Sequence, residues 1–432
     1  MRGTTLPWRF AFRFVGTLAP PVVLSLAGGA FAAEPLPAPT SAVVPAPVPQ
    51  MFDLHQCREL ARAQQPAIAA ARASLTAAVE KQQALDKLRF AAVIQRDLPA
   101  RRKQAAVGVQ AADAAVTLAE ADALYGVTFS YLSVLYANEQ LQVADAAIED
   151  LKRLLESVQK SVESGDARRE IGKTQVDLIR TYLSAAQARR EEAVEGLQRA
   201  ASALREAVGV GPSCPVTLAQ SKLLDLDVTP DKEQILALAL ARRGEMAQAN
   251  AAFEATCLEV EAQRSTFFFS GRTFAMGSDI HAHPIPAAEH NDRYRPGAIS
   301  IEMPALLTGM RGDRVQQAES LHERAGAVVD KTRNLVTLDA EQTYLRWLEA
   351  AKQLPHLREA ATASDRAATA LRTGFNPGAR GKGTVEEVLA GGLLATNQKL
   401  HLNQARYQAL IGLAGLERAT AGGFCAGFEA PR

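Results

Sequence analysis

The sequence predicts a mainly α-helical protein made of two tandem copies of one unit, each built from very long antiparallel helices. Three observations favour this class. Only 6% of the 432 residues are aromatic, whereas strong helix formers such as Ala, Leu, Glu, Gln and Arg are abundant. Apolar residues recur three or four positions apart over long stretches without proline, which is the period of an amphipathic helix. Segments of the first half also return in the second half at a fixed spacing.

The overall composition excludes several classes of function. Lys+Arg 48 and Asp+Glu 47 give a net charge of +1, so no basic excess exists to neutralise phosphates and we expect no nucleic-acid partner. No Ser-His-Asp order or HExxH motif is visible, so we predict a protein that is not an enzyme and uses no cofactor. Four scattered cysteines without a Cys-x-x-Cys pair exclude a disulfide scaffold and a zinc ribbon: Cys57, Cys214, Cys257 and Cys425.

The first 50 residues are expected to be an export signal and a linker. Arginines precede an apolar stretch that ends in Ala30-Phe31-Ala32, a small-x-small cleavage site, so residues 1–32 are predicted to be a secretory signal peptide. An uncleaved membrane anchor is the alternative for this stretch. Residues 33–50 are rich in Pro and Ala and are predicted to form an extended linker. No later run of about 18 apolar residues predicts a transmembrane helix.

The first repeat is predicted to span residues 51–212. Its opening helix contains Pro66, which should kink it or split it into two coaxial pieces. A stretch without proline then predicts a helix over residues 99–163, roughly 90 Å long at about 1.5 Å per residue. Gly165 breaks that helix, and a return helix follows over residues 168–208.

Matching segments define the second repeat. Residues 60–75 overlay residues 238–253 at a constant offset of 178 positions, and a Tyr-Leu-x-x-Leu-x-Ala motif occurs once in each half. A third match pairs Gly209, after the first return helix, with Gly415. The remaining boundaries predicted on this basis are an inter-repeat linker over residues 213–230, a second repeat over 231–422 and a poorly ordered tail over 423–432.

The second copy contains about 35 extra residues, because 65 positions separate Pro66 from Tyr131 whereas 100 separate Gly244 from Tyr344. The extra segment is strand-like, with glycines and prolines between its apolar runs. We therefore predict a β-hairpin at about residues 265–303, and no matching hairpin near residues 90–100 of the first copy. The two strands are expected near 266–275 and 298–303. Aromatic residues on the apolar stripes of the long helices are expected in the core: Tyr131, Tyr344 and Trp347.

This order of elements resembles the TolC-like outer membrane efflux proteins over about residues 52–422. The motifs that carry the resemblance are the opening helix with Pro66, the segment from Met303 to Gly309, and the closing stretch from Gly383 to Gly415. The resemblance implies a homotrimer whose strands form an outer-membrane β-barrel and whose helices form a periplasmic tunnel. It also implies a periplasmic adaptor, an inner-membrane pump and outer membrane lipid as partners.

The resemblance further implies a constriction at the helix tips. Family carboxylates that ring the tunnel map onto Glu387, which keeps the charge, and Ala390, which does not. The predicted gate residue is therefore Glu387, and a solvated helix face is the alternative for its side chain. Residues predicted to contact a partner or the opposite tip are Gly165, Arg168, Arg169, Lys173, Gly374 and Thr384.

Two alternatives to a passive efflux or type I secretion conduit stay open at this point. With one hairpin per chain, three chains would supply only about six strands, fewer than the roughly eight of the smallest usual membrane barrel, which favours an exported helical rod that acts as a scaffold. His281, His283 and His290 lie within ten residues of one another and suggest a weak metal site and a metal-dependent enzyme. A solvated loop at the hairpin tip is the simpler interpretation of these histidines.

Overall fold

A computed structural model describes residues 51–88, 95–165, 167, 171–212, 214–266, 297–299, 307–378 and 383–428. These residues belong to one unit that spans Pro47–Arg432. The predicted signal peptide and linker lie outside the described residues, as do nearly all of the predicted hairpin, the three clustered histidines, and Arg168 and Arg169.

The first repeat opens with the strand β1 (Met51–Phe52) and a helix that is split as predicted. Gln65 has an extended backbone between the two pieces, and Pro66 takes the first position of the second piece, where its missing N–H costs nothing. The four helices of this repeat are α1 (Leu54–Gln64), α2 (Pro66–Lys87), α3 (Leu98–Glu163) and α4 (Lys173–Val208).

The second repeat copies this plan, after a linker that contains the strand β2 (Thr217–Leu218). Its helices are α5 (Lys232–Arg242), α6 (Gly244–Ser265), α7 (Arg311–Gly374) and α8 (Val385–Ala419). Helices α5 and α6 begin 178 positions after α1 and α2, and α7 begins 213 positions after α3. The difference of 35 positions equals the length of the predicted insert, so the tandem repeat is confirmed.

One part of the repeat alignment was wrong. Helix α8 begins 212 positions after α4, which pairs the buried residues Leu204 and Ala207 with Leu416 and Ala419. Gly415 therefore lies inside α8 and does not correspond to Gly209, which ends α4 in a left-handed conformation. The error arose because two Ala-Leu pairs followed by glycine looked alike without the helix boundaries.

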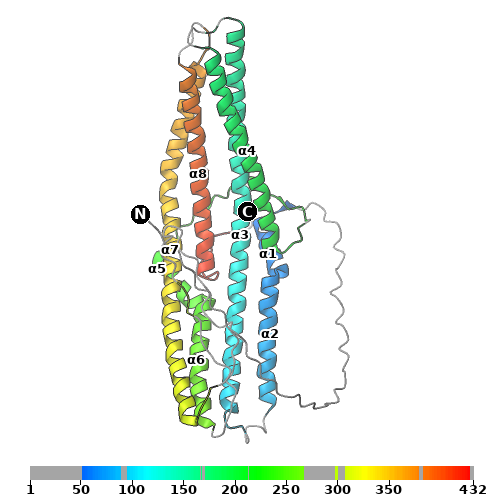
Figure 1. The fold of residues 1–432 in the computed structure, drawn as a ribbon, viewed down its shortest axis with the longest axis vertical. Coiled ribbons are helices and arrows are strands. Elements are labelled where there is room, and N and C mark those ends of the chain that lie inside the picture. The colour runs from blue at the N-terminus through cyan, green and yellow to red at the C-terminus, as the bar shows by residue number, and fades with distance from the viewer. Residues whose placement is uncertain are drawn as a thin grey trace, which may run out of the picture. The chain divides into compact units, whose positions relative to one another are not determined.

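The helices form a layer in which α3 and α7 run along the whole length and the shorter helices fill the two halves between and beside them (Figure 1). In one half α2 packs on α3, and α6 packs between α3 and α7. In the other half α4 packs on α3, and α8 packs between α3 and α7. At about 1.5 Å per residue the 66 residues of α3 span about 100 Å. The outer side of α7 and the outer sides of α2 and α4 are the two open edges of this layer.

The main core lies at the middle of the layer, where the two repeats meet. Tyr131 is fully buried, Trp347 is 7% exposed and Tyr344 is partly buried against them, so the predicted core role of these three residues is confirmed. Strands β1 and β2 pair in parallel, with Met51 opposite Thr217 and Phe52 opposite Leu218. Sequence reasoning missed this pairing because two-residue strands carry no periodicity. None of the helices in the described ranges is both long and apolar enough to cross a membrane.

The chain after Gly422 is not a loose tail, which corrects the prediction for residues 423–428. The chain turns at Gly422, which has a φ of 72°, and runs back over the main core. Ala426 is fully buried and Phe428 is 5% exposed within that core. Burial of these two apolar side chains stabilises the packing of the segment on the main core.

Candidate functional site

The predicted site lies at the end of the layer where α3 meets α4 and α7 meets α8 (Figure 1). Gly165 has a φ of 74° and allows the turn after α3, while Gly374 ends α7. Ala167 and Gly378 form an antiparallel bridge, which joins the turn of the first repeat to that of the second. The sequence did predict these two glycines as tip residues, but it did not indicate that the two tips bind each other.

A small apolar cluster holds this end together, separately from the main core. It combines side chains of α3, α4 and α8 with the segment just before α4. Because its members come from both repeats, α8 cannot move away from α3 and α4 without exposing apolar surface. Its buried members are Val158, Ile171, Val176, Ile179, Val385 and Leu389.

Glu387, the predicted gate residue, is exposed and completes the N-terminal cap of α8. Its backbone N–H donates to the Thr384 hydroxyl at 3.1 Å, and its carboxylate accepts from the Thr384 backbone N–H at 2.9 Å. This reciprocal arrangement is a capping box, which satisfies two N–H groups that a helix start leaves unpaired. The pattern Thr384-Val385-Glu386-Glu387 carries its signature, and sequence reasoning overlooked it. The cap fixes the Glu387 side chain at the very tip of α8.

At the tip of the first repeat, where α3 meets α4, Lys173 is the first residue of α4 and its side chain is exposed. The structure gives Lys173 no ion pair with Glu387, and the other two predicted cations lie outside the described residues. The structure thus brings Thr384 and Glu387 together, and the proposed pairing between the tips remains a prediction. Among the described residues no group of three or more His, Cys, Asp and Glu side chains could hold a metal ion.

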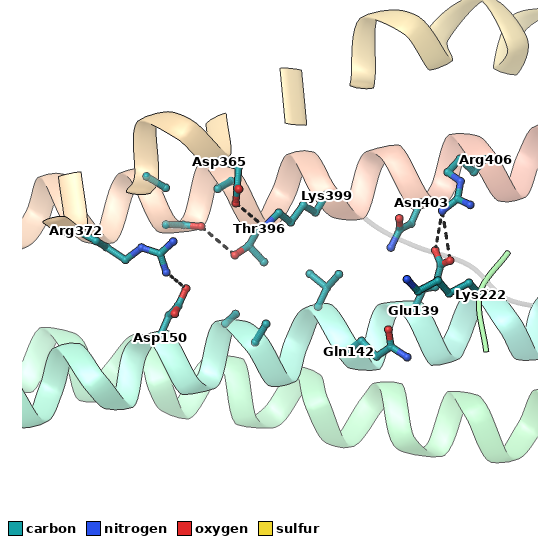
Figure 2. Close-up of a pocket in the computed structure, with 16 residues that line it drawn as sticks. Glu139, Gln142, Asp150, Lys222, Asp365, Arg372, Thr396, Lys399, Asn403 and Arg406 are labelled. Carbon is teal, nitrogen blue, oxygen red and sulfur yellow. Dashed lines mark hydrogen bonds and ion pairs between the residues drawn. The ribbon is translucent and has the colours of Figure 1, made fainter. Parts of the chain in front are cut away.

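Behind the tips a groove of about 360 Å³ separates α3 from α8 and α7 (Figure 2). Three cross-helix ion pairs line it: Glu139 with Arg406 at 3.3 Å, Asp365 with Lys399 at 2.5 Å, and Asp150 with Arg372. Small residues of all three helices, among them Ala147, Ala368 and Ala395, leave its space open. Sequence reasoning did not find this groove, because its partners lie far apart along the chain.

The contact between α3 and α8, here called the α3–α8 seam, changes character along its length. Near the main core it is apolar and aromatic: Leu132 is fully buried, and the rings of Tyr136 and Tyr407 stack at 4.6 Å. Ser133 Oγ lies 2.8 Å from the Tyr407 hydroxyl. Towards the tips the seam becomes charged, beginning with Glu139 and Arg406. Buried apolar contacts therefore hold the two repeats together at the middle of the layer, and weaker polar contacts join them between the middle and the tips.

The inter-repeat linker crosses this seam where the aromatic part ends. The backbone N–H of Leu223 donates to Glu139 Oε1 at 2.9 Å, and Arg406 donates to the carbonyl oxygen of Leu223 at 3.2 Å. Glu139 is only 6% exposed, so its charge is compensated by this backbone N–H and by the Arg406 guanidinium. The linker thus fastens α3 to α8 at one level.

Comparison with known proteins identifies the fold. No family model and no curated protein sequence matches the chain. Several solved structures do match. The structure of the outer-membrane channel OprN matches with 15% identity, a TM-score of 0.68 and coverage of 86% of this chain and 90% of that one. The Campylobacter jejuni CmeC outer membrane channel matches with 12% identity, a TM-score of 0.68 and 86% coverage of both chains. The outer membrane protein VceC from Vibrio cholerae matches with 16% identity, a TM-score of 0.63 and coverage of 86% and 96%. The chain therefore has the fold of outer membrane efflux channels, as the resemblance to TolC-like proteins implies.

Proposed function

We propose that this protein is the outer membrane channel component of a tripartite efflux or type I secretion system, a passive conduit for small molecules or proteins. The observation that carries the proposal is the layer itself, in which two helices of 66 and 64 residues run along the whole length, shorter helices pack between them, and two edges stay open. A layer this thin buries little apolar surface by itself and gains burial by packing on copies of itself.

Closure of such layers explains why a conduit results. The two open edges differ, so one edge of a chain has to meet the other edge of the next, and such head-to-tail contacts form a ring when the rotation closes. Three copies is the number that the resemblance implies. The ring would enclose a passage along the helices, with a periplasmic adaptor and an inner-membrane pump at the tips and outer membrane lipid at the opposite end.

The tips of α7 and α8 would form the gate of this passage. In a trimer three Glu387 carboxylates would converge near the axis, where like charges favour a bound cation or a basic group of the neighbouring tip. Arg168, Arg169 and Lys173 are the candidate basic groups. Exposed pairs of this kind contribute about 0–1 kcal/mol each, so several must act together to close the passage.

The channel role is tested with protein purified from cell membranes. A trimer in the outer membrane fraction that conducts ions in a planar bilayer would support it. A soluble, non-conducting periplasmic species would refute it and favour the alternative of an exported helical rod that serves as a scaffold.

The gate is tested with Glu387→Gln, which removes the charge and retains the cap, because a glutamine also completes a capping box. The expected result is weaker block of the single-channel current by divalent cations. Glu386→Gln is the matched control, because Glu386 is exposed beside Glu387 but takes no part in the cap. A Glu387→Gln channel with the conductance and the cation sensitivity of the wild type would remove Glu387 from the gate.

A further inference from the structure

Four aromatic side chains form a continuous strip along the α3–α8 seam, here called the aromatic strip: Tyr125, Phe129, Tyr136 and Tyr407. The ring centroids of Tyr125 and Phe129 lie 6.1 Å apart, and those of Phe129 and Tyr407 lie 6.4 Å apart. The stacked pair of Tyr407 and Tyr136 continues the strip. The three tyrosines pack against the main core, whereas Phe129 is 41% exposed. The ring of Phe129 is therefore accessible to another molecule.

The rings beside Phe129 are held in place without covering it. Ser133 Oγ donates to the carbonyl oxygen of Phe129 at 2.7 Å, so it accepts its bond of 2.8 Å from the Tyr407 hydroxyl. This bond fixes the Tyr407 ring. The rings of Tyr125 and Tyr407 are tilted against Phe129 by 40° and 58°, so neither lies flat on it. A planar molecule can stack on the exposed ring while the tilted rings contact its edges.

Phe129 lies on the face of the layer opposite the inter-repeat linker. The Tyr131 hydroxyl donates to Gln220 Oε1 at 3.2 Å, and Asn138 Nδ2 donates to the carbonyl oxygen of Ser221 at 2.9 Å. These contacts place the linker on the side of α3 that carries Tyr131 and Asn138. Phe129 comes two positions before Tyr131, which is about 200° around the helix. The exposed ring of the aromatic strip therefore points away from the linker.

In a closed ring of these layers, the face that carries Phe129 would line the passage. The C-terminal segment contacts the linker, because a Cβ at Gly427 would lie 4.0 Å from Leu226 Cδ2. Linker and C-terminal segment would obstruct a passage on their side of the layer, so the opposite face must be the inner one. In this half of the layer α3 and α8 lie between α4 and α7, so copies that join at the two edges leave the aromatic strip uncovered (Figure 1).

We propose that the aromatic strip binds uncharged planar aromatic molecules by stacking on Phe129, and that such molecules are a substrate class of the conduit. The proposal rests on the proposed function and names what passes through it. The side chains of the strip carry no charge. Asp122, one turn before Tyr125, binds Arg418 at 2.6 Å, and the Arg418 guanidinium lies 5.5 Å from the centroid of the Tyr125 ring. The charges at this end of the strip are thus already paired, and ring stacking selects the ligand.

Binding of 1-naphthol to the purified full chain tests the site, with fluorescence anisotropy of the naphthol as the readout. Phe129→Leu keeps an apolar side chain at this exposed position but removes the ring. We expect it to raise the dissociation constant about threefold to tenfold, which is the effect of one aromatic contact. Decahydro-1-naphthol has the same two fused rings without aromaticity, so it should displace 1-naphthol poorly from the wild type.

The matched control is Phe253→Leu on α6. Phe253 is 39% exposed, almost the same fraction as Phe129, and its ring stacks on His322 with the centroids 4.3 Å apart. It lies outside the aromatic strip, so this variant should bind 1-naphthol with the wild-type affinity. The pair of variants separates a site at Phe129 from general adsorption to exposed phenylalanines.

Single-channel recording provides a second measurement. In a planar bilayer, 1-naphthol should interrupt the wild-type current briefly, and Phe129→Leu should shorten these interruptions about threefold to tenfold. A conducting wild type that binds no 1-naphthol, or equal affinities of the Phe129→Leu and Phe253→Leu variants, would overturn the aromatic site and leave the channel proposal standing. Binding that depends on Phe129 in a protein that never conducts would instead overturn the proposed function.

Discussion

Arg243 Nη1 lies 2.6 Å from Asp339 Oδ2 and ties the break between α5 and α6 to the middle of α7. Arg243 also donates through Nε to both oxygens of Glu245 at 3.1 Å. In the first repeat the equivalent break, between α1 and α2, is stabilised by a different contact. The counterpart of Arg243 is Gln65, whose side chain donates to the carbonyl oxygen of Ala207 at 3.0 Å near the end of α4. A buried ion-pair network and a neutral cap thus hold equivalent helix breaks.

Replacing Asp339 with Ala should strongly destabilise the fold. The change would leave the guanidinium of Arg243, which is 3% exposed, short of a partner. Breaking a buried pair in this way costs about 3–5 kcal/mol of unfolding free energy, measurable by urea denaturation. Asp330→Ala is the control, because its pair with Arg333 is exposed and should change the midpoint little. Equal effects of the two variants would contradict a structural role for the network.

Two glycines of α8 should respond in opposite ways to alanine. A Cβ at Gly412 would lie 2.9 Å from Trp347 Cα and 2.7 Å from its Cβ, so Gly412→Ala should force α8 from α7 and cost about 1–3 kcal/mol. A Cβ at Gly392 meets nothing within 4 Å. Gly392→Ala should therefore stabilise the helix by about 0.5–1 kcal/mol. Thermal unfolding followed by circular dichroism compares them, and a stable Gly412→Ala variant would refute the close helix approach.

Phe428→Ala should destabilise the protein although it lies near the end of the sequence. Its ring is buried in the main core, and removing a buried phenylalanine costs about 3–5 kcal/mol. The neighbouring Cys425 is exposed, so Cys425→Ala should leave the denaturation midpoint unchanged. Indistinguishable midpoints for the two variants would restore the interpretation of this segment as a loose tail.

Alkaline pH should unfold the chain through groups of the main core. Burial, and then the nearby Asp53 charge, raise the pKa of the Cys57 thiol from 9.0 to about 12. Because the unfolded thiol ionises first, the folded chain loses stability as pH rises from about 9 to 12, by up to about 1.4 kcal/mol per pH unit for this one group. Burial also raises the pKa of the neighbouring Tyr131 hydroxyl, which adds to the loss at higher pH.

The comparison of urea midpoints at pH 8 and pH 10.5 tests this prediction. Cys57→Ala should lower stability at pH 8 by leaving a cavity but should show a smaller decrease between the two pH values. Cys257→Ala, at an exposed position, should keep the wild-type decrease. The same decrease in all three proteins would assign the alkaline transition to other groups.

The sequence predicted the helices well because their signals are local. Pro66 marks a helix break and Gly165 marks a turn. The spacing of about 3.6 residues between apolar side chains indicates a helix whatever that helix later packs against. The capping box at Thr384 and Glu387 was also readable, because its two residues are three positions apart. The groove was not, because Asp150 and Arg372 are 222 positions apart and meet only once α8 has packed between the long helices. The packing of Phe428 likewise depends on a core that distant helices build.

The pair formed by Arg58 and Glu417 has a consequence for how the chain folds. Arg58 donates to both carboxylate oxygens of Glu417, at 2.7 and 3.2 Å, across 359 positions of sequence. Contacts of such separation form late, because the loop-closure entropy must be overcome before the contact contributes. Long helices such as α3 and α7 can form within microseconds, so the slow step is the meeting of α1 with α8. Until then the apolar side chains of the main core stay exposed to water, and the chain is most prone to aggregate during this interval.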